Sequence, residues 1–244
     1  MHTTLANLYR RQGRYSEAEP LFQRALAAYE RAFGPDHASL MLPLDSLATL
    51  YMSRGRYRQA EPLYRRALII GENTLGPEHP DTARTLNNLG ELYRQQGHYG
   101  EAEPLYRRAV AAYEKSLGPE DFRTATPLNN LATLYLDKGR LAEAEALYQK
   151  VLATLEKGRG PEHPDVARTL DNLGELYRRQ GHSTKAEPLY QRALAILEKA
   201  LGPEHPDVAI VLNDLAKLYQ EQGRNREAEV LRQRASAIER RSSH

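Results

Sequence analysis

Asparagine recurs at intervals of 42 residues in the middle of the chain, at Asn88, Asn130 and Asn172. A primary amide both donates and accepts hydrogen bonds, so a row of amides can hold the backbone of an extended peptide whatever its side chains are. Asparagine is also a poor residue for a helix interior, so its repeated use there needs a reason. We predict that this row binds a peptide backbone; the alternative is that each amide bonds a neighbouring helix or water.

Four arginines flank two of these asparagines along the chain: Arg84, Arg94, Arg168 and Arg178. A guanidinium group suits bidentate binding of carboxylates, which predicts a protein or peptide ligand that contains acidic residues. The alternative is that Glu91 and Glu175 pair with these arginines and cancel part of their charge.

The same surface of the predicted helices carries further candidate ligand contacts, which are the polar Asn87, Asn129 and Thr133 and the apolar Met52 and Leu136. Exposed apolar groups on such a surface suit pockets for ligand side chains. The predicted ligand therefore mixes acidic residues with large apolar ones.

No catalytic or cofactor motif is found. The chain has no cysteine, which excludes thiolate ligands and thiol nucleophiles, and it has no phosphate-binding loop or catalytic triad spacing. His79, His163 and His205 recur at one position before a proline, and we interpret them as helix-start residues rather than metal ligands. We predict that the protein is not an enzyme and uses no cofactor or metal.

The elements that position these residues are set by two glycine series, each with a step of 42 residues. One series is Gly13, Gly55, Gly97, Gly139, Gly181 and Gly223; the other is Gly34, Gly76, Gly118, Gly160 and Gly202, each followed by proline. Two such breaks per period predict two elements per period. Apolar residues at helical spacing before and after Gly97 predict that both elements are helices.

The 42-residue repeats also alternate between two types, which gives a second period of 84 residues. The segments that lead to Gly97 and Gly181 resemble each other more than they resemble those leading to Gly55 and Gly139. Proline inside a helix deletes a backbone hydrogen bond and clashes with the preceding turn. We therefore predict that the helices containing Pro43 and Pro127 start later than their counterparts, after a longer connector.

The small and large residues of each period resemble the tetratricopeptide repeat. In the third copy they are Leu89, Gly90 and Tyr93 in the first helix and Ala102, Tyr106 and Ala109 in the second. The 42-residue period, the longer second helix and the GPEHP connector are most similar to the kinesin-light-chain type. The resemblance implies an all-α, right-handed superhelical solenoid of six helix-turn-helix repeats, whose first helices form a concave groove that binds peptides and proteins. The arginines resemble part of the carboxylate clamp of chaperone-tail binders, with a longer repeat spacing.

The predicted organisation is a single repeat array over residues 1–244. The repeats cover about 1–36, 37–78, 79–120, 121–162, 163–204 and 205–244. Both ends look cut, because the first copy opens with a short helix and Arg232 replaces an aromatic residue in the last copy. We expect the array to be a module of a larger protein, and end-to-end self-association is an alternative role.

The charge composition argues against nucleic acid and membrane partners. The 34 basic and 32 acidic residues are interspersed and give a net charge of +2, so no strong field attracts RNA, the less favoured alternative ligand. No apolar run is long enough to span a membrane, and the N-terminus lacks a signal-peptide core. We predict a cytoplasmic protein-interaction scaffold.

Overall fold

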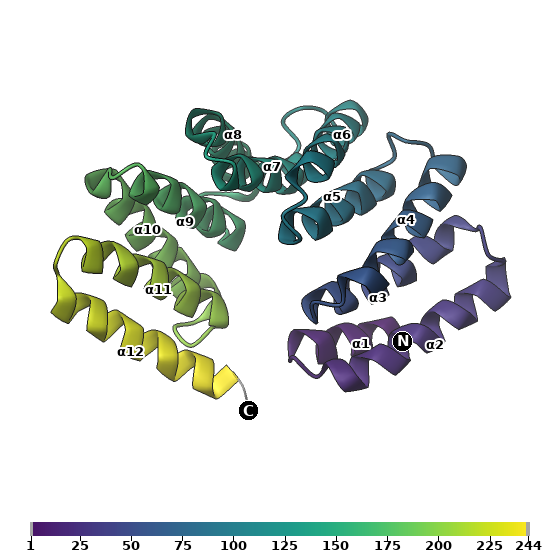
Figure 1. Cartoon of the computed structure of the whole chain (residues 1–244), viewed down its shortest axis with the longest axis horizontal. Coiled ribbons are helices and arrows are strands. Elements are labelled where there is room, and N and C mark those ends of the chain that lie inside the picture. The colour runs from purple at the N-terminus through teal and green to yellow at the C-terminus, as the bar shows by residue number, and fades with distance from the viewer. Residues whose placement is uncertain (1, 243–244) are drawn as a thin grey trace. The chain divides into compact units, whose positions relative to one another are not determined.

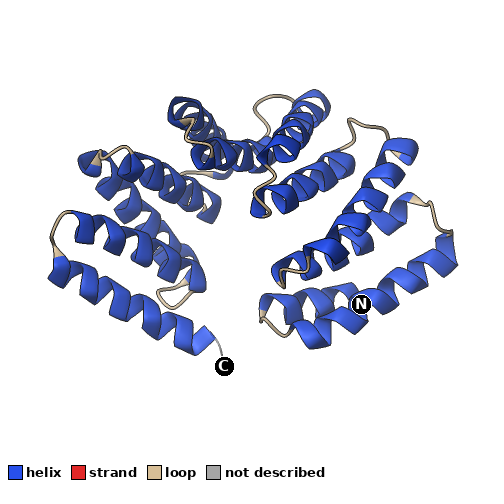
Figure 2. Ribbon diagram, in the orientation of Figure 1, coloured by secondary structure: helices blue, strands red, loops and turns tan. Residues whose placement is uncertain are grey.

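Two helices form in each 42-residue period of the computed structural model of this protein, which describes residues 2–242 (Figure 1). That range contains twelve α-helices, two short 3-10 helices and no strand (Figure 2). The predicted all-α class, with turns at the first glycine series and connectors at the second, is confirmed.

The first helices of the periods are α1 (His2–Arg11), α3 (Met41–Ser53), α5 (Pro80–Gln95), α7 (Ala125–Asp137), α9 (Pro164–Arg179) and α11 (Pro206–Glu221). The second helices are α2 (Tyr15–Phe33), α4 (Tyr57–Thr74), α6 (Tyr99–Leu117), α8 (Leu141–Arg159), α10 (Ser183–Leu201) and α12 (Asn225–Ser242). The 3-10 helices are η1 (Ala38–Leu40) and η2 (Phe122–Thr124).

Residue contacts divide the chain into two compact units, residues 1–130 and 131–244, which we call the N-terminal and C-terminal units. The division falls within α7. The N-terminal unit holds α1 to α6 and the start of α7, and the C-terminal unit holds the end of α7 and α8 to α12. Each unit is described by itself below.

The third copy shows why these sequences form paired helices. Pro80 begins α5, where its missing N–H costs no hydrogen bond, and the His79 Nδ1 atom accepts a hydrogen bond from the Asp81 N–H at 3.1 Å. Gly97 has a φ of +77°, which a residue with a side chain rarely adopts, and it turns the chain from α5 into α6. The predicted helix-start role of the histidines is confirmed at His79, His163 and His205.

Aromatic side chains of the second helices form the centre of each helix pair. Tyr106 from α6 is fully buried, as are its equivalents Phe22, Tyr64, Tyr148 and Tyr190. A methyl group added to Gly90 of α5 would lie 3.0 Å from the Tyr106 ring, so the absence of a side chain at Gly90 lets the ring pack directly on the α5 backbone.

The helices α3 and α7 start three residues later than α5 does relative to the turn glycine. They have 13 residues each against 16 for α5 and α9, and η1 and η2 occupy the difference. Pro43 and Pro127 consequently lie in the first turn, where a proline needs no hydrogen-bond partner. The predicted late start and longer connector are confirmed.

Candidate functional site

The asparagine pairs of the first helices have two different environments. In the N-terminal unit Asn88 of α5 and Asn130 of α7 are half-buried, whereas Asn87 and Asn129 are each only 7% exposed. Asn130 Nδ2 donates a hydrogen bond of 2.9 Å to Asn87 Oδ1 and so ties α7 to α5. The prediction that Asn87 and Asn129 lie on the open surface is wrong, because both side chains are buried, Asn87 against Asn130 of α7.

The half-buried amides keep part of their hydrogen-bonding capacity. Asn130 uses one amide hydrogen on Asn87, which leaves its second hydrogen and its carbonyl oxygen without a partner among the described residues. Asn88 makes no hydrogen bond through its amide to any residue that the structure describes. Asn172 is the equivalent amide of α9 in the C-terminal unit and is also half-buried.

Arg84 of α5 is held by two aspartates of the N-terminal unit. It donates to Asp81 one turn earlier and, from Nε, to Asp45 Oδ2 of α3 at 3.4 Å. Thr85 also donates to both oxygens of Asp45, at 3.1 and 3.0 Å. Burial raises the pKa of Asp45 to about 6, and the bonds from Arg84 and Thr85 limit this rise.

Arg94 lies at the other end of α5 and is paired with Glu91. Arg94 Nε and Nη2 donate to the two Glu91 oxygens at 2.9 and 2.8 Å, and the Tyr106 hydroxyl donates to Glu91 at 2.8 Å. Burial would raise the pKa of Glu91, but the bonds and charge of Arg94, with Gln95 and Tyr106, outweigh it and lower the pKa. The guanidinium therefore neutralises a carboxylate that orients the core tyrosine.

The C-terminal unit pairs its arginines in the same way. Arg168 donates to Asp165 at 3.2 Å, and Arg178 donates from Nε and Nη2 to Glu175 at 2.7 and 2.8 Å. Arg178 also bonds Glu221 of α11. The alternative that acidic neighbours cancel the charge describes all four arginines, although Arg84 and Arg168 use aspartates rather than Glu91 and Glu175.

The apolar candidates differ from one another in exposure. Met52 is half-buried, but Leu136 is only 4% exposed, so the prediction of an open apolar group at Leu136 is wrong. Burial of the Leu136 side chain is favourable because it removes apolar surface from water. Arg94 at the equivalent position of α5 instead pairs with the Glu91 carboxylate. Thr133, one turn earlier on α7, hydrogen-bonds the Tyr148 hydroxyl at 2.9 Å and so supports the core.

A hollow of about 320 Å³ opens in the N-terminal unit beside Arg84. Tyr29, Met41 and Leu42 line it together with Asp81, and Leu42 is 53% exposed. Sequence reasoning missed this feature, because Tyr29 comes from α2 and only the packing of α2 against the start of α3 brings it there. An apolar ligand side chain suits its walls.

No group of three or more histidine, aspartate or glutamate side chains in the described part of the chain is placed to hold a metal ion. Among the same residues, no helix has both the length and the apolar character needed to cross a membrane.

The sequence model of the family described as Tetratricopeptide repeat matches residues 1–68, 39–115, 123–199 and 183–241. These matches cover most of the chain, which therefore belongs to the tetratricopeptide-repeat family. No curated protein sequence matches the chain.

Two solved structures show similarity in both fold and sequence. BtubC (BKLC) from P. vanneervenii is 27% identical, with a TM-score of 0.70 over 95% of this chain and 91% of that one. A putative kinesin light chain with nearly identical TPR-like repeats from Podosopora anserina is 29% identical, with a TM-score of 0.66 over 85% of this chain and 99% of that one. The resemblance to the kinesin-light-chain type is confirmed.

A third structure shows the fold alone. Aspartyl phosphate phosphatase F from Bacillus subtilis is 18% identical, with a TM-score of 0.73 over 100% of this chain and 60% of that one. The repeat class and these neighbours support a protein-interaction scaffold in general, and a tetratricopeptide fold is typically not catalytic.

Proposed function

We propose that this protein binds an extended segment of a partner protein on the exposed surfaces of its first helices. The observation that carries the proposal is the pair of half-buried amides in the N-terminal unit, Asn88 on α5 and Asn130 on α7. They lie on successive first helices and have donors and acceptors left over. A peptide backbone offers the matching groups at regular intervals.

A buried asparagine supports this role for Asn130. Asn87 accepts one hydrogen of Asn130 and so fixes the orientation of the Asn130 side chain before any ligand arrives. A side chain that is already ordered loses little conformational entropy on binding. Of the adjacent asparagines in α5, Asn87 thus joins α5 to α7, and Asn88 is the residue that binds the ligand.

The ion pairs limit the charge preference of this surface. A ligand carboxylate can bind Arg84 or Arg94 only in competition with Asp81 and Glu91, which already accept their hydrogen bonds. We propose that acidic ligand residues add modest selectivity and that large apolar residues occupy the hollow beside Leu42.

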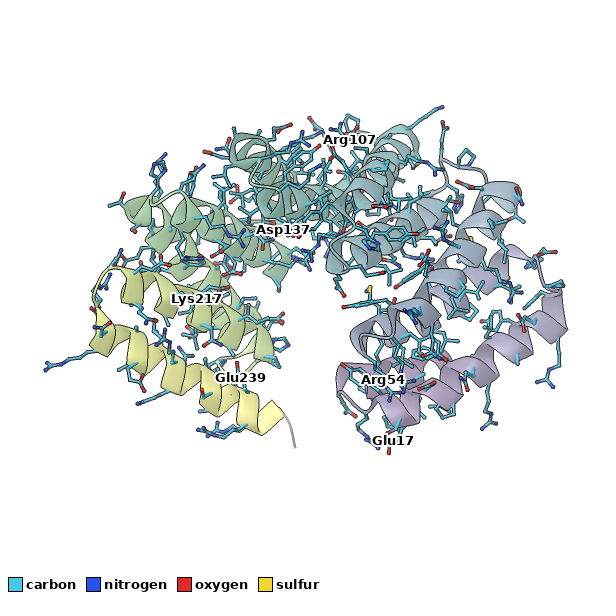
Figure 3. The ribbon with its side chains drawn as sticks, in the orientation of Figure 1. Glu17, Arg54, Arg107, Asp137, Lys217 and Glu239 are labelled. Carbon is cyan, nitrogen blue, oxygen red and sulfur yellow. The ribbon has the colours of Figure 1, made fainter. Side chains whose placement is uncertain are left out.

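The test uses a peptide selected by display against the whole chain. We expect Asn88→Ala and Asn130→Ala each to weaken binding by about fivefold to tenfold, which corresponds to about 1–1.4 kcal/mol for one hydrogen bond. The matched control is Arg107→Ala on the second helix α6, where the side chain is 57% exposed (Figure 3).

The two variants and the control separate the possible binding surfaces. Unchanged affinity in both asparagine variants, together with loss of binding in the Arg107 variant, would place the ligand on the second helices and refute the proposal. End-to-end self-association and a cytoplasmic location stay predictions, and light scattering over a range of concentrations tests the former.

A further inference from the structure

A cavity of about 200 Å³ lies in the C-terminal unit among α9, α10 and α11. Leu197, Ile210 and Val211 form apolar walls, and Asp171 of α9 contributes a carboxylate. The volume far exceeds the roughly 10–15 Å³ that one water molecule requires. A cavity of this size that combines apolar walls with carboxylates suits an amphipathic side chain.

Asp171 has an unsatisfied carboxylate oxygen. Its Oδ1 atom is buried and accepts no hydrogen bond from any described residue. The residue at the same place in α5 is Asn87, which accepts from Asn130 of the next first helix. The residue that corresponds to Asn130 on α11 is Asp214, which as a carboxylate cannot donate, and Lys217 of α11 donates to it at 2.6 Å.

The equivalent aspartate of the N-terminal unit shows which partner is missing. Asp45 of α3 accepts hydrogen bonds from Arg84 and Thr85 of the next first helix. In the C-terminal unit Ile210 and Val211 stand at the positions of Arg84 and Thr85 relative to the turn glycine. Two apolar residues thus replace the guanidinium and the hydroxyl, and the cavity lies beside them.

The charges around Asp171 make the site receptive to a cation. Burial is the largest cause that raises the pKa of Asp171 to about 8, and the charges of Asp214 and Glu175 add to it while Lys217 opposes it. At the cavity itself Arg159 and Arg168 are both bonded to Asp165 and neutralise it, and Asp207 adds a further exposed carboxylate. Asp171 and Asp207 are therefore the lining carboxylates that no arginine of the described residues pairs with, and a cation bound there would favour the ionised form of Asp171.

We propose that this cavity binds an arginine side chain of a partner protein, whose guanidinium donates to Asp171 in the place that Arg84 fills beside Asp45. Its aliphatic part packs on Leu197, Ile210 and Val211, as long cationic side chains do on apolar surfaces. The inference rests on the proposed binding function and names one ligand residue for the C-terminal unit.

The first experiment tests the cavity without a partner. The whole chain, labelled with ¹³C in its aspartate carboxyl groups, is titrated with n-propylguanidinium chloride. The Asp171 resonance is assigned by its loss in Asp171→Asn. With the probe at about tenfold its Kd, the midpoint of that resonance should fall by roughly one pH unit. The resonance of Asp45, which already has its partners, should not move and serves as the internal control.

A substitution within the chain provides the second arm. Ile210→Arg places a guanidinium at the position of Arg84 and should lower the Asp171 midpoint without any probe. It should also abolish the response to n-propylguanidinium. An equal effect of sodium chloride or 1-butanol, or an Asp171 midpoint that neither the probe nor Ile210→Arg changes, would overturn the inference.

The third arm keeps this inference separate from the proposed function. For a display-selected peptide, each arginine is replaced in turn by citrulline, which has the same shape and no charge. One replacement should weaken binding to the native chain about tenfold and leave binding to Asp171→Asn nearly unchanged. Loss of binding in the Asn88 and Asn130 variants without any such coupling would support the scaffold and refute the arginine site.

Discussion

The helix pairs α3–α4 and α5–α6 of the N-terminal unit each bury a tyrosine at the same position, but the hydroxyl groups of the two tyrosines have different hydrogen-bond partners. Tyr64 of α4 shares a hydrogen bond of 2.8 Å with Thr49, whose hydroxyl also bonds the Asp45 carbonyl at 2.8 Å. Tyr106 of α6 instead donates to Glu91, which is ion-paired with Arg94. The C-terminal unit repeats the contrast with Thr133 and Glu175.

The small residue before the hydrogen-bond partner differs between the two pairs. Ala48 precedes Thr49, whereas Gly90 precedes Glu91 and lies against the Tyr106 ring. At the same buried place one fold thus holds a neutral pair next to an alanine and a charged cluster next to a glycine. The 84-residue period in the sequence therefore has a structural consequence.

The largest expected effect is common to both helix pairs. Tyr106→Ala and Tyr64→Ala should each lower the free energy of unfolding by about 3–5 kcal/mol, because both rings are fully buried. Urea denaturation of each variant measures it. A loss below about 1 kcal/mol for either would show that its ring is not central to its pair.

The hydroxyl groups should separate the two pairs. Tyr106→Phe removes a bond to an ionised group and should cost about 1.5–3 kcal/mol, whereas Tyr64→Phe removes a bond between neutral groups and should cost about 0.5–1.5 kcal/mol. The comparison fails if Tyr64→Phe proves the more costly change in the same denaturation experiment.

The small residues should be specific to their pair. Gly90→Ala places a methyl group 3.0 Å from the Tyr106 ring and should cost about 1–3 kcal/mol, although alanine favours helices. Adding Glu91→Thr converts the site to the α3 type, and a double-mutant cycle should show coupling of at least about 0.5 kcal/mol. Strict additivity of the two changes would contradict a linked pair of positions.

Stability should depend on pH through Asp171 more than through Asp45. The pKa of Asp171 is raised from 3.8 to about 8 in the folded protein, so the folded state holds the proton more tightly than the unfolded state does. The free energy of unfolding should therefore fall as pH rises from about 4 to 8, and Asp171→Asn should remove this fall. The pKa of Asp45 is raised only to about 6, so the fall in the free energy of unfolding that Asp45 causes should end at about pH 6. Thermal melts across this range check both, and an unchanged slope in Asp171→Asn would contradict the assignment.

The smallest expected effect is that of Arg84→Lys. The surface bond to Asp81 contributes about 0–1 kcal/mol, and lysine keeps the charge beside Asp45. Thermal melts should show a shift of only a few degrees at most. A loss as large as that of Tyr106→Phe would mean that the guanidinium geometry, rather than its charge, supports Asp45.

The helices and turns could be predicted from the sequence because their signals are local. Pro80 and Gly97 each act on the backbone at their own position, and 42-residue spacing repeats the signal in every copy. The late start of α3 followed equally from Pro43. These features need no knowledge of how helices pack.

The candidate site could be predicted only in part, because it depends on packing between repeats. Asn87 and Asn88 are neighbours of the same type, and only the next first helix decides that Asn87 is buried. The pairing of Arg94 with Glu91 follows from helical spacing, because the two residues lie three apart in α5. The unsatisfied carboxylate oxygen of Asp171 could have been predicted from the sequence, because Ile210 lies at the position of its repeat where Arg84 lies in the third repeat.

The most direct test of the central claim, that neutral amides rather than free arginines bind the ligand, is a salt titration. The Kd of a display-selected peptide is measured at several sodium chloride concentrations for the native chain, Asn130→Ala and Arg94→Ala. We predict a shallow salt dependence, because Glu91 already neutralises Arg94, and a larger loss of affinity in Asn130→Ala than in Arg94→Ala. A steep salt dependence that disappears in Arg94→Ala, with Asn130→Ala binding normally, would contradict the account.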